Sequence, residues 1–214
     1  MKTNTSLALA AALALGCGLA QADDNIVKVG VTRYDTHSKT NGISGIGVPP
    51  GADAETNDAT TLIFVYERLF TPQVGLEFVL GIPPTIKAKA TGSVAFLNGT
   101  GTVLSAKNVA PTLLLNYHFF SPGDTWRPYI GAGINYTHFS DIKSSLAPDV
   151  KMGNSTGLAV QAGINYAITK DIGLFASIAK INVKSKVVAT GSTVLTTTVD
   201  FRPIVYSAGV SYQF

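Results

Sequence analysis

The sequence has 214 residues, of which 46% are hydrophobic and only 14% are charged. A typical soluble domain carries about 25% charged residues, so this chain has either a large buried core or an apolar solvent around it. The formal net charge is only +3 and the basic residues occur singly, which argues against a nucleic-acid-binding surface. With one cysteine, the chain forms no internal disulfide.

The N-terminus has the pattern of a secretory signal peptide. A basic residue precedes the apolar run Leu7–Leu15, and small residues occupy the cleavage positions in Ala20–Ala22. We therefore predict that residues 1–22 are removed and that residues 23–214 form the mature protein. The alternative is a lipid anchor on Cys17, although the usual Leu three residues before the cysteine is absent.

The mature chain reads as strands throughout. Val, Ile, Tyr, Phe and Thr alternate with Gly, Ala and polar residues, and helical periodicity is nearly absent. No run is apolar enough for a membrane-spanning helix, so a membrane location requires a closed barrel. Eight strands of about ten residues are expected, the length that crosses a bilayer at a tilt. They are Asn25–Tyr34, Thr60–Phe70, Val74–Pro83, Val109–Phe120, Pro128–Phe139, Thr156–Ile168, Ile172–Lys184 and Phe201–Phe214.

The connections between these segments alternate in length. The short ones are 71–73, 121–127 and 169–171; the long ones are 35–59, 84–108, 140–155 and 185–200. Short periplasmic turns, long external loops and an even strand count are typical of bacterial transmembrane barrels. The sequence therefore predicts an all-β protein, an eight-stranded antiparallel transmembrane β-barrel with short periplasmic turns and long extracellular loops, in the bacterial outer membrane.

The two faces of the strands differ. In the sixth segment Leu158 and Val160 alternate with Ala159 and Gln161, so the apolar set should face lipid and the small polar set the lumen. Aromatic residues gather near strand ends, as in an interfacial girdle, although the ends of a soluble barrel can look the same. They are Tyr66, Phe70, Tyr117, Phe119, Tyr129, Tyr136, Tyr166, Tyr206, Tyr212 and Phe214.

Charged residues in the strands indicate which charges the lumen must contain. In the preferred phase Glu67 and Glu77 point inward and Lys180 outward, and the two carboxylates need Lys28 or another cation nearby. Eight strands leave an interior about wide enough for side chains, which excludes a general aqueous porin. The residues expected to line the lumen are Glu67, Glu77, Gly81, Leu114 and Asn116.

Three prolines fall on neighbouring strands. Pro83 and Pro84 end the third segment and Pro111 lies in the fourth, so none of them donates a ladder hydrogen bond. Missing donors on facing strands predict a lateral opening there. The alternative is that these prolines only start and stop strands above the membrane plane.

The first long connection, Thr40–Ala59, has two interpretations. Its Gly, Pro and Ala content, together with Ile43, Ile46 and Val48, is compatible with an apolar vestibule. The alternative, a plain flexible surface loop, is the commoner case for such a segment.

No enzymatic motif stands out. The histidines are His37, His118 and His138, without metal-ligand spacing, a nucleophile elbow or a phosphate loop. His118 is the one inward candidate for a lipid-modifying enzyme, which would also need a Ser or Asp beside it. We therefore expect no enzyme, no metal site and no cofactor.

Several stretches resemble the OmpW/AlkL family of outer-membrane proteins, in the same order and over nearly all of the mature chain. The most specific is Arg127–Thr137, which looks like the family's fifth-strand motif. The others are Asp58–Leu62 in the second strand, Gly75–Phe78 with Ile82–Pro83 in the third, Ala110–Tyr117 in the fourth and Ser207–Phe214 in the last.

The resemblance implies a narrow hydrophobic channel that passes small apolar molecules across the lipopolysaccharide leaflet and releases them sideways through the wall. By position its constriction falls on Val79 and Ala179, and Ala179 departs from the large aromatic residue of some relatives. The terminal Tyr212 and Phe214 would be the signal read by the barrel-assembly machinery. The implied partners are outer-membrane lipid, lipopolysaccharide and small hydrophobic solutes, with the barrel acting as a monomer.

Two functions stay open at this point. The first is passive uptake of small hydrophobic molecules with lateral release. The second is a non-transporting surface barrel whose loops serve adhesion or stress protection. A continuous apolar path in the lumen favours the first, and a filled interior without a gap in the wall favours the second.

Overall fold

The computed structural model of the chain describes residues 25–36, 39–40, 42–145, 147–190 and 194–214. The predicted signal peptide and Cys17 lie outside the described residues. Within them, no helix is long and apolar enough to cross a membrane.

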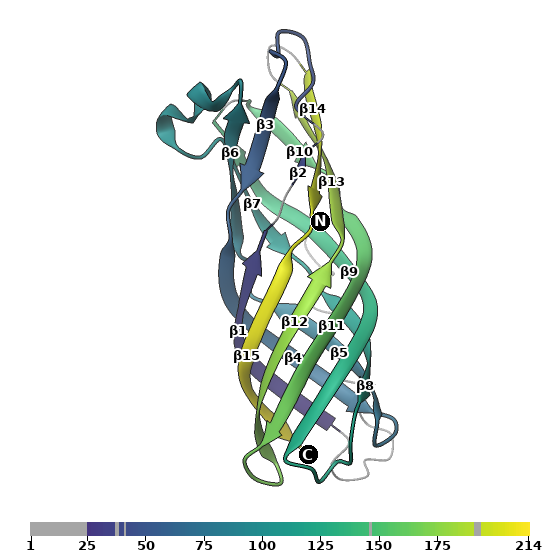
Figure 1. Cartoon of the computed structure of the whole chain (residues 1–214). Helices are drawn as coiled ribbons and strands as arrows, with labels where there is room; N and C mark the ends of the chain where they lie inside the picture. Colours follow the sequence, from purple (N-terminus) through teal and green to yellow (C-terminus); the bar gives the residue numbers. More distant parts are fainter. Residues whose placement is uncertain (1–24, 37–38, 41, 146, 191–193) are drawn as a thin grey trace, which may run out of the picture.

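Eight antiparallel strands form a closed barrel, which confirms the predicted fold class (Figure 1). Each strand pairs with the next along the chain, β11 pairs with β9, and β15 returns to β1 with Val29 opposite Val210. Closure leaves no unpaired edge, which lipid requires because it offers no hydrogen-bonding partner. The barrel strands are β1 (Asn25–Asp35), β4 (Ala59–Leu69), β5 (Val74–Gly81), β8 (Thr112–His118), β9 (Trp126–Ser144), β11 (Ser155–Ala167), β12 (Ile172–Ile181) and β15 (Ile204–Gln213).

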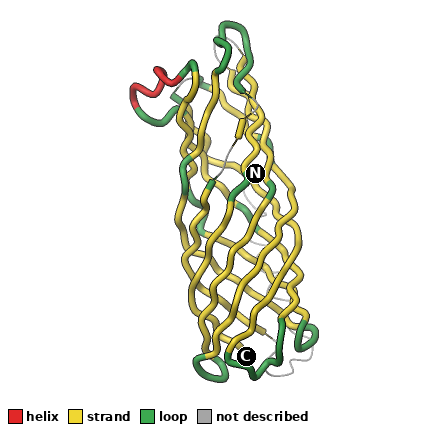
Figure 2. The backbone as a smooth tube through the Cα atoms, in the orientation of Figure 1, coloured by secondary structure: helices red, strands yellow, loops and turns green. Residues whose placement is uncertain are grey.

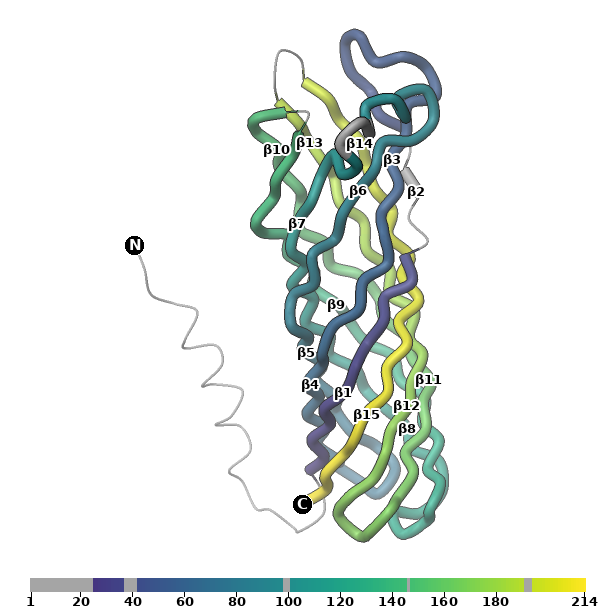
Figure 3. Tube along the Cα trace, turned by 90° about the vertical axis from the view of Figure 1, so that its left-hand side faces the viewer, coloured from purple at the N-terminus to yellow at the C-terminus, as the bar shows by residue number. Residues whose placement is uncertain are grey.

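The long connections are largely strands, not loops as predicted. They prolong the wall beyond the barrel as two sheets, shown rising together in Figures 2 and 3. The physical reason is alternation: buried Ala88 and Ala106 alternate with exposed Lys87 and Lys107, a pattern that favours a sheet with one dry face. These strands are β2 (Lys39–Thr40), β3 (Ala52–Thr56), β6 (Thr85–Gly92), β7 (Leu104–Val109), β10 (Asp149–Met152), β13 (Val183–Thr190) and β14 (Val194–Phe201), with a short 3-10 helix at Ala95–Thr100.

Several predicted strand ends were wrong. The third strand ends at Gly81, before Pro83, and Pro111 lies between β7 and β8 instead of inside the fourth strand. Proline has no N–H for the ladder, so pairing stops beside it. The last barrel strand begins at Ile204, because Pro203 separates it from β14.

The outer face of the barrel is apolar between two aromatic levels. Along β9 the exposed residues run from Trp126 through Ile130 and Ile134 to Tyr136. Ten residues at about 3.3 Å each, tilted by about 40°, span about 25 Å, the height of the apolar band of an outer-membrane barrel. The prediction that Tyr129 belongs to this girdle was wrong, because its side chain points into the lumen and is 2% exposed.

Candidate functional site

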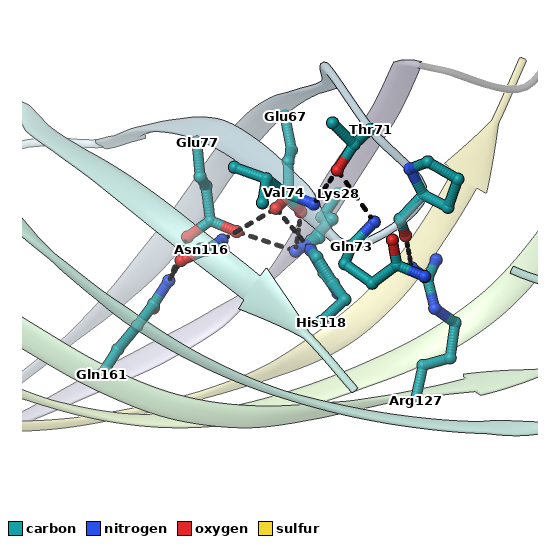
Figure 4. A network of polar contacts seen from close by, with 11 residues as sticks. Lys28, Glu67, Thr71, Gln73, Val74, Glu77, Asn116, His118, Arg127 and Gln161 are labelled. Atoms are coloured by element: carbon teal, nitrogen blue, oxygen red, sulfur yellow. Dashed lines mark hydrogen bonds and ion pairs between the residues drawn. The ribbon is translucent and has the colours of Figure 1, made fainter. Parts of the chain in front are cut away.

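A cluster of polar side chains fills the lumen near the short turns (Figure 4). We call it the polar plug. Its members come from five strands and all are buried: Lys28 on β1, Glu67 on β4, Glu77 on β5, Asn116 and His118 on β8, and Gln161 on β11.

Lys28 is the centre of the charge balance in the polar plug. Its Nζ donates to Glu67 Oε2 at 2.9 Å and to Glu77 Oε2 at 2.7 Å. It also lies 4.9 Å from the centroid of the Tyr129 ring. One ammonium group between two carboxylates meets the condition that buried charges must be paired.

The amides and the imidazole occupy the remaining carboxylate oxygens. Asn116 Nδ2 donates to Glu67 Oε1 at 2.8 Å, and His118 Nε2 lies 2.7 Å from the same atom. Gln161 Nε2 donates to Glu77 Oε1 at 2.7 Å and to Asn116 Oδ1 at 2.8 Å. This hydrogen-bonded network closes the barrel to an apolar solute, because such a solute cannot replace the hydrogen bonds that its passage would break.

Tyr129 completes the seal beside the polar plug. Its ring centroid lies 5.2 Å from that of His118. The ring fits because residue 163 is glycine: a Cβ there would come within 2.4 Å of Tyr129 Cζ. A small residue on the lumen face therefore leaves space for an aromatic side chain.

An apolar chamber lies on the other side of the polar plug. We call it the lower chamber. Lys28, Glu77 and Gln161 form its polar floor, and its walls are mostly aliphatic and aromatic. Among the wall residues are Tyr34, Ile63, Val65, Val79, Leu114, Phe175 and Ala179.

Three further voids continue from the lower chamber into the extension. The middle void shares Tyr34 with the lower chamber and shares Phe139 and Phe201 with the next void. The two upper voids have Ala88, Leu104 and other apolar residues in common. Neighbouring voids thus share lining residues and lie in succession above the polar plug.

Two phenylalanine rings separate the middle void from the upper voids. Phe139 on β9 and Phe201 on β14 have ring centroids 5.7 Å apart and are each 4% exposed. We call this pair the aromatic neck. Both residues were expected at strand ends, and their contact in the lumen was not predicted. Their inward position follows from the alternation once β9 and β14 are extended.

The ladder between β5 and β8 is interrupted beside this path. Its last rung joins Val79 and Thr112, and pairing resumes between β6 and β7 at Thr85 and Lys107. We call the interval the wall break. Pro84 and Asn108 border the middle void there, and Gly81 and Ala110 border the lower chamber.

The prolines lie at this wall break. The Pro111 carbonyl accepts from Tyr136 N at 3.0 Å, so it is tied to β9, and the Pro84 carbonyl accepts from Asn108 N at 3.1 Å. Pro83 is exposed and precedes Pro84. The structure thus brings the three predicted residues to one interval of the wall, while pairing on either side is intact.

The other predicted residues divide between two places. Glu67, Glu77 and Asn116 belong to the polar plug, whereas Gly81 and Leu114 line the lower chamber. Val79 and Ala179 also line the lower chamber, away from the aromatic neck. The terminal Tyr212 and Phe214 rings stack with centroids 5.7 Å apart and are each 48% exposed.

The apolar residues of the first long connection lie in two different environments. Ile43 and Val48 pack against a buried cluster of Ala52, Ala90, Val94 and Val103, and Ile43 lines an upper void. Ile46 is 85% exposed and takes no part.

His118 has no catalytic arrangement around it. Its Nε2 is held by Glu67, and its buried Nδ1 has no partner among the residues that the structure describes. In the same residues, no group of three or more His, Cys, Asp or Glu is placed to hold a metal ion.

A closed antiparallel barrel with an apolar belt, a polar plug and apolar chambers defines an outer-membrane β-barrel protein. The comparisons with known proteins give the particular family. The OmpW family model matches residues 21–214, so the chain belongs to the OmpW family.

Three similar proteins illustrate the match. Outer membrane protein W of Vibrio cholerae is 27% identical over 221 residues, covering 100% of this chain and 99% of its own. Dibenzothiophene metabolism operon protein PahQ of Pseudomonas aeruginosa is 32% identical over 155 residues, covering 71% of this chain and 68% of its own. The crystal structure of OprG from Pseudomonas aeruginosa has a TM-score of 0.83 and 25% identity, covering 90% of this chain and 96% of that one. The chain is an outer-membrane protein of this family.

Proposed function

We propose that the barrel takes up small hydrophobic molecules passively and releases them sideways through the wall break. The observation that carries the proposal is the position of the apolar voids beside the wall break. Apolar voids lie in succession above the polar plug, which bars a straight passage, and the lower chamber and the middle void border the wall break.

The energetics favour this route. An apolar solute gains about 25 cal/mol per Å² of surface that leaves water, and it keeps this gain when it moves from an apolar chamber into lipid. Passage through the polar plug would instead require breaking hydrogen bonds of buried charged groups, which costs several kcal/mol. Lateral release is therefore the downhill direction.

The printed name of one relative supports the class of solute. PahQ is named for an operon of dibenzothiophene metabolism, and dibenzothiophene is a flat apolar molecule. Small hydrophobic solutes of that kind suit chambers with aliphatic and aromatic walls. The proposal includes a monomer that contacts lipid directly, is inserted by the assembly machinery through Tyr212 and Phe214, and performs no catalysis.

The test is uptake of a long-chain alkane by a deletion strain that carries the wild-type protein or a variant. Pro84→Val combined with Pro111→Val adds two ladder donors at the wall break and is expected to lower uptake several-fold. Pro122→Val in a short turn is the matched control and should behave as wild type. Equal uptake in the double variant, at equal folded protein, contradicts lateral release at this place.

The alternative function, a surface barrel that only displays its external sheets, gives a different result. It predicts that the deletion strain takes up the alkane as fast as the complemented strain. The wall break is the observation against it, since a barrel used only for display needs no interruption of the ladder.

A further inference from the structure

The outer surface of the extension carries a group of lysines above the wall break. Lys87 and Lys89 on β6, Lys107 on β7 and Lys143 on β9 point outward, with Ser105 between them. We call this the cationic face. The strands β6, β7 and β9 are neighbours in one sheet, so these side chains share one surface.

Register brings two of the lysines to the sides of one hydroxyl. Lys87 is opposite Ser105, and Ser105 is opposite Lys143. Strands are about 4.8 Å apart, so the two lysine backbones are about 10 Å apart across Ser105. Two flexible side chains at this separation can both reach one phosphate group between them, with the serine hydroxyl as a further donor.

The charges on this face are unequally balanced. Lys107 Nζ lies 2.7 Å from Asp141 Oδ2, and Lys89 is opposite Glu55 in the ladder. In the described part of the chain, neither Lys87 nor Lys143 forms an ion pair. Lys143 does act electrostatically on Asp141 without pairing with it, so Lys87 is the less balanced of the two. These two ammonium groups are the ones outside an ion pair and can meet an external anion.

The height of the cationic face matches the headgroup region. Tyr136 marks the upper edge of the apolar belt on β9, and Lys143 follows seven residues later. At about 3.3 Å per residue and a tilt of about 40°, Lys143 lies about 18 Å above that edge. Lys107, opposite Ser140, lies about 10 Å above it by the same arithmetic. Acyl chains end below these levels, and phosphorylated sugars occupy them in the outer leaflet.

We propose that the cationic face is a binding site for a phosphate group of a lipopolysaccharide headgroup, held by Lys87 and Lys143 with Ser105 between them. The ammonium groups neutralise the phosphate charge, and the hydroxyl donates a hydrogen bond to it. The site lies above the wall break, which is level with Tyr136 at the upper edge of the apolar belt. A lipid bound there has its headgroup next to that interval. The proposal does not depend on the passage of solutes.

Binding is tested with the full-length mature protein in phosphatidylcholine nanodiscs, titrated with a short lipopolysaccharide whose inner-core sugars carry phosphate groups. Each lysine near an anionic lipid surface contributes about 1 kcal/mol, so Lys87→Gln with Lys143→Gln is expected to weaken binding about thirty-fold. Wild-type affinity should fall as salt rises.

The control removes the same charge from the other sheet, at a pair of which Lys184 is ion-paired with Asp200. Lys184→Gln with Lys186→Gln on β13 is expected to change the affinity by less than about threefold. Equal loss in the two double variants would overturn the proposal, because any pair of lysines would then serve. Equal wild-type affinity for the dephosphorylated lipid would overturn it as well. Alkane uptake is measured separately, so failure of this site is distinguishable from failure of lateral release.

Discussion

The barrel and its extension both alternate buried and exposed residues, but with opposite faces. In the barrel, Lys28 and Glu67 are inside while Ile130 and Val160 are exposed. In the extension, Val187 is buried while Lys186 on the same strand is exposed. Alternation is common to both regions, and the medium outside decides which face is apolar.

The interiors differ in consequence. The polar plug fills the barrel near the short turns with paired charges, whereas the extension contains small voids lined by apolar residues. Buried charged groups must pair with one another, and the resulting network of side chains closes that region. Apolar side chains impose no such pairing, so the extension keeps room for a guest.

The largest effect is expected from removing the cation of the polar plug. Lys28→Met leaves Glu67 and Glu77 buried without a counter-charge and should lower the free energy of unfolding by about 3–5 kcal/mol. Urea unfolding in lipid vesicles measures it. Adding Glu67→Gln and Glu77→Gln to this variant should recover most of the loss, and a loss below about 1 kcal/mol in the single variant contradicts the assigned pairing.

A charge on the outer surface distinguishes the two media. Ile130 is 52% exposed in the apolar belt, and Ile130→Arg should lower the free energy of unfolding by about 2–4 kcal/mol. Ile46 is 85% exposed in the extension, and Ile46→Arg should change it by less than about 0.5 kcal/mol. Equal effects in the same urea experiment would mean that both positions meet the same medium.

The aromatic neck should control which solutes enter the lower chamber. Phe139→Leu removes ring atoms between the middle and upper voids and should raise the uptake of a branched over a linear alkane about tenfold. The competition is measured in cells with equal amounts of folded barrel. Phe96→Leu is the control, since Phe96 is 75% exposed in the extension, and it should leave the ratio unchanged.

The smallest effect is expected on the surface of the extension. The hydrogen bond from Lys107 to Asp141 holds the pKa of that carboxyl below its ordinary value. A lowered folded pKa contributes stability above the unfolded pKa, and that contribution is lost as pH falls through the folded pKa. Both groups are exposed, so Asp141→Asn should shift acid unfolding only slightly, measured as the midpoint of a pH titration. A large shift would show that this pair is not screened by water.

Much of the barrel was predictable from residues alone. Alternation in segments such as 156–168, the even strand count and the sorted connection lengths predicted the closed fold and its location, and both are confirmed. The need of Glu67 and Glu77 for a cation pointed to Lys28, which lies 2.9 and 2.7 Å from them. These features are predictable because they follow from local periodicity and from the cost of an unpaired buried charge.

The extension was not predictable in the same way. Its segments are short and rich in Gly, Ser and Thr, so the sequence resembled loops. They become strands by pairing in succession, β7 with β9 and β6 with β7. The aromatic neck also arises this way, because Phe139 and Phe201 lie 62 positions apart and meet only across the lumen.

By itself the sequence determined the period of two, the length of the strands and the apolar belt, since each is a property of neighbouring residues in one solvent. The tertiary structure alone decided how far the wall continues beyond the membrane, which rings meet in the lumen and where the ladder is interrupted. Those depend on closing a sheet through contacts between distant strands, and no local pattern specifies which residues closure brings opposite each other.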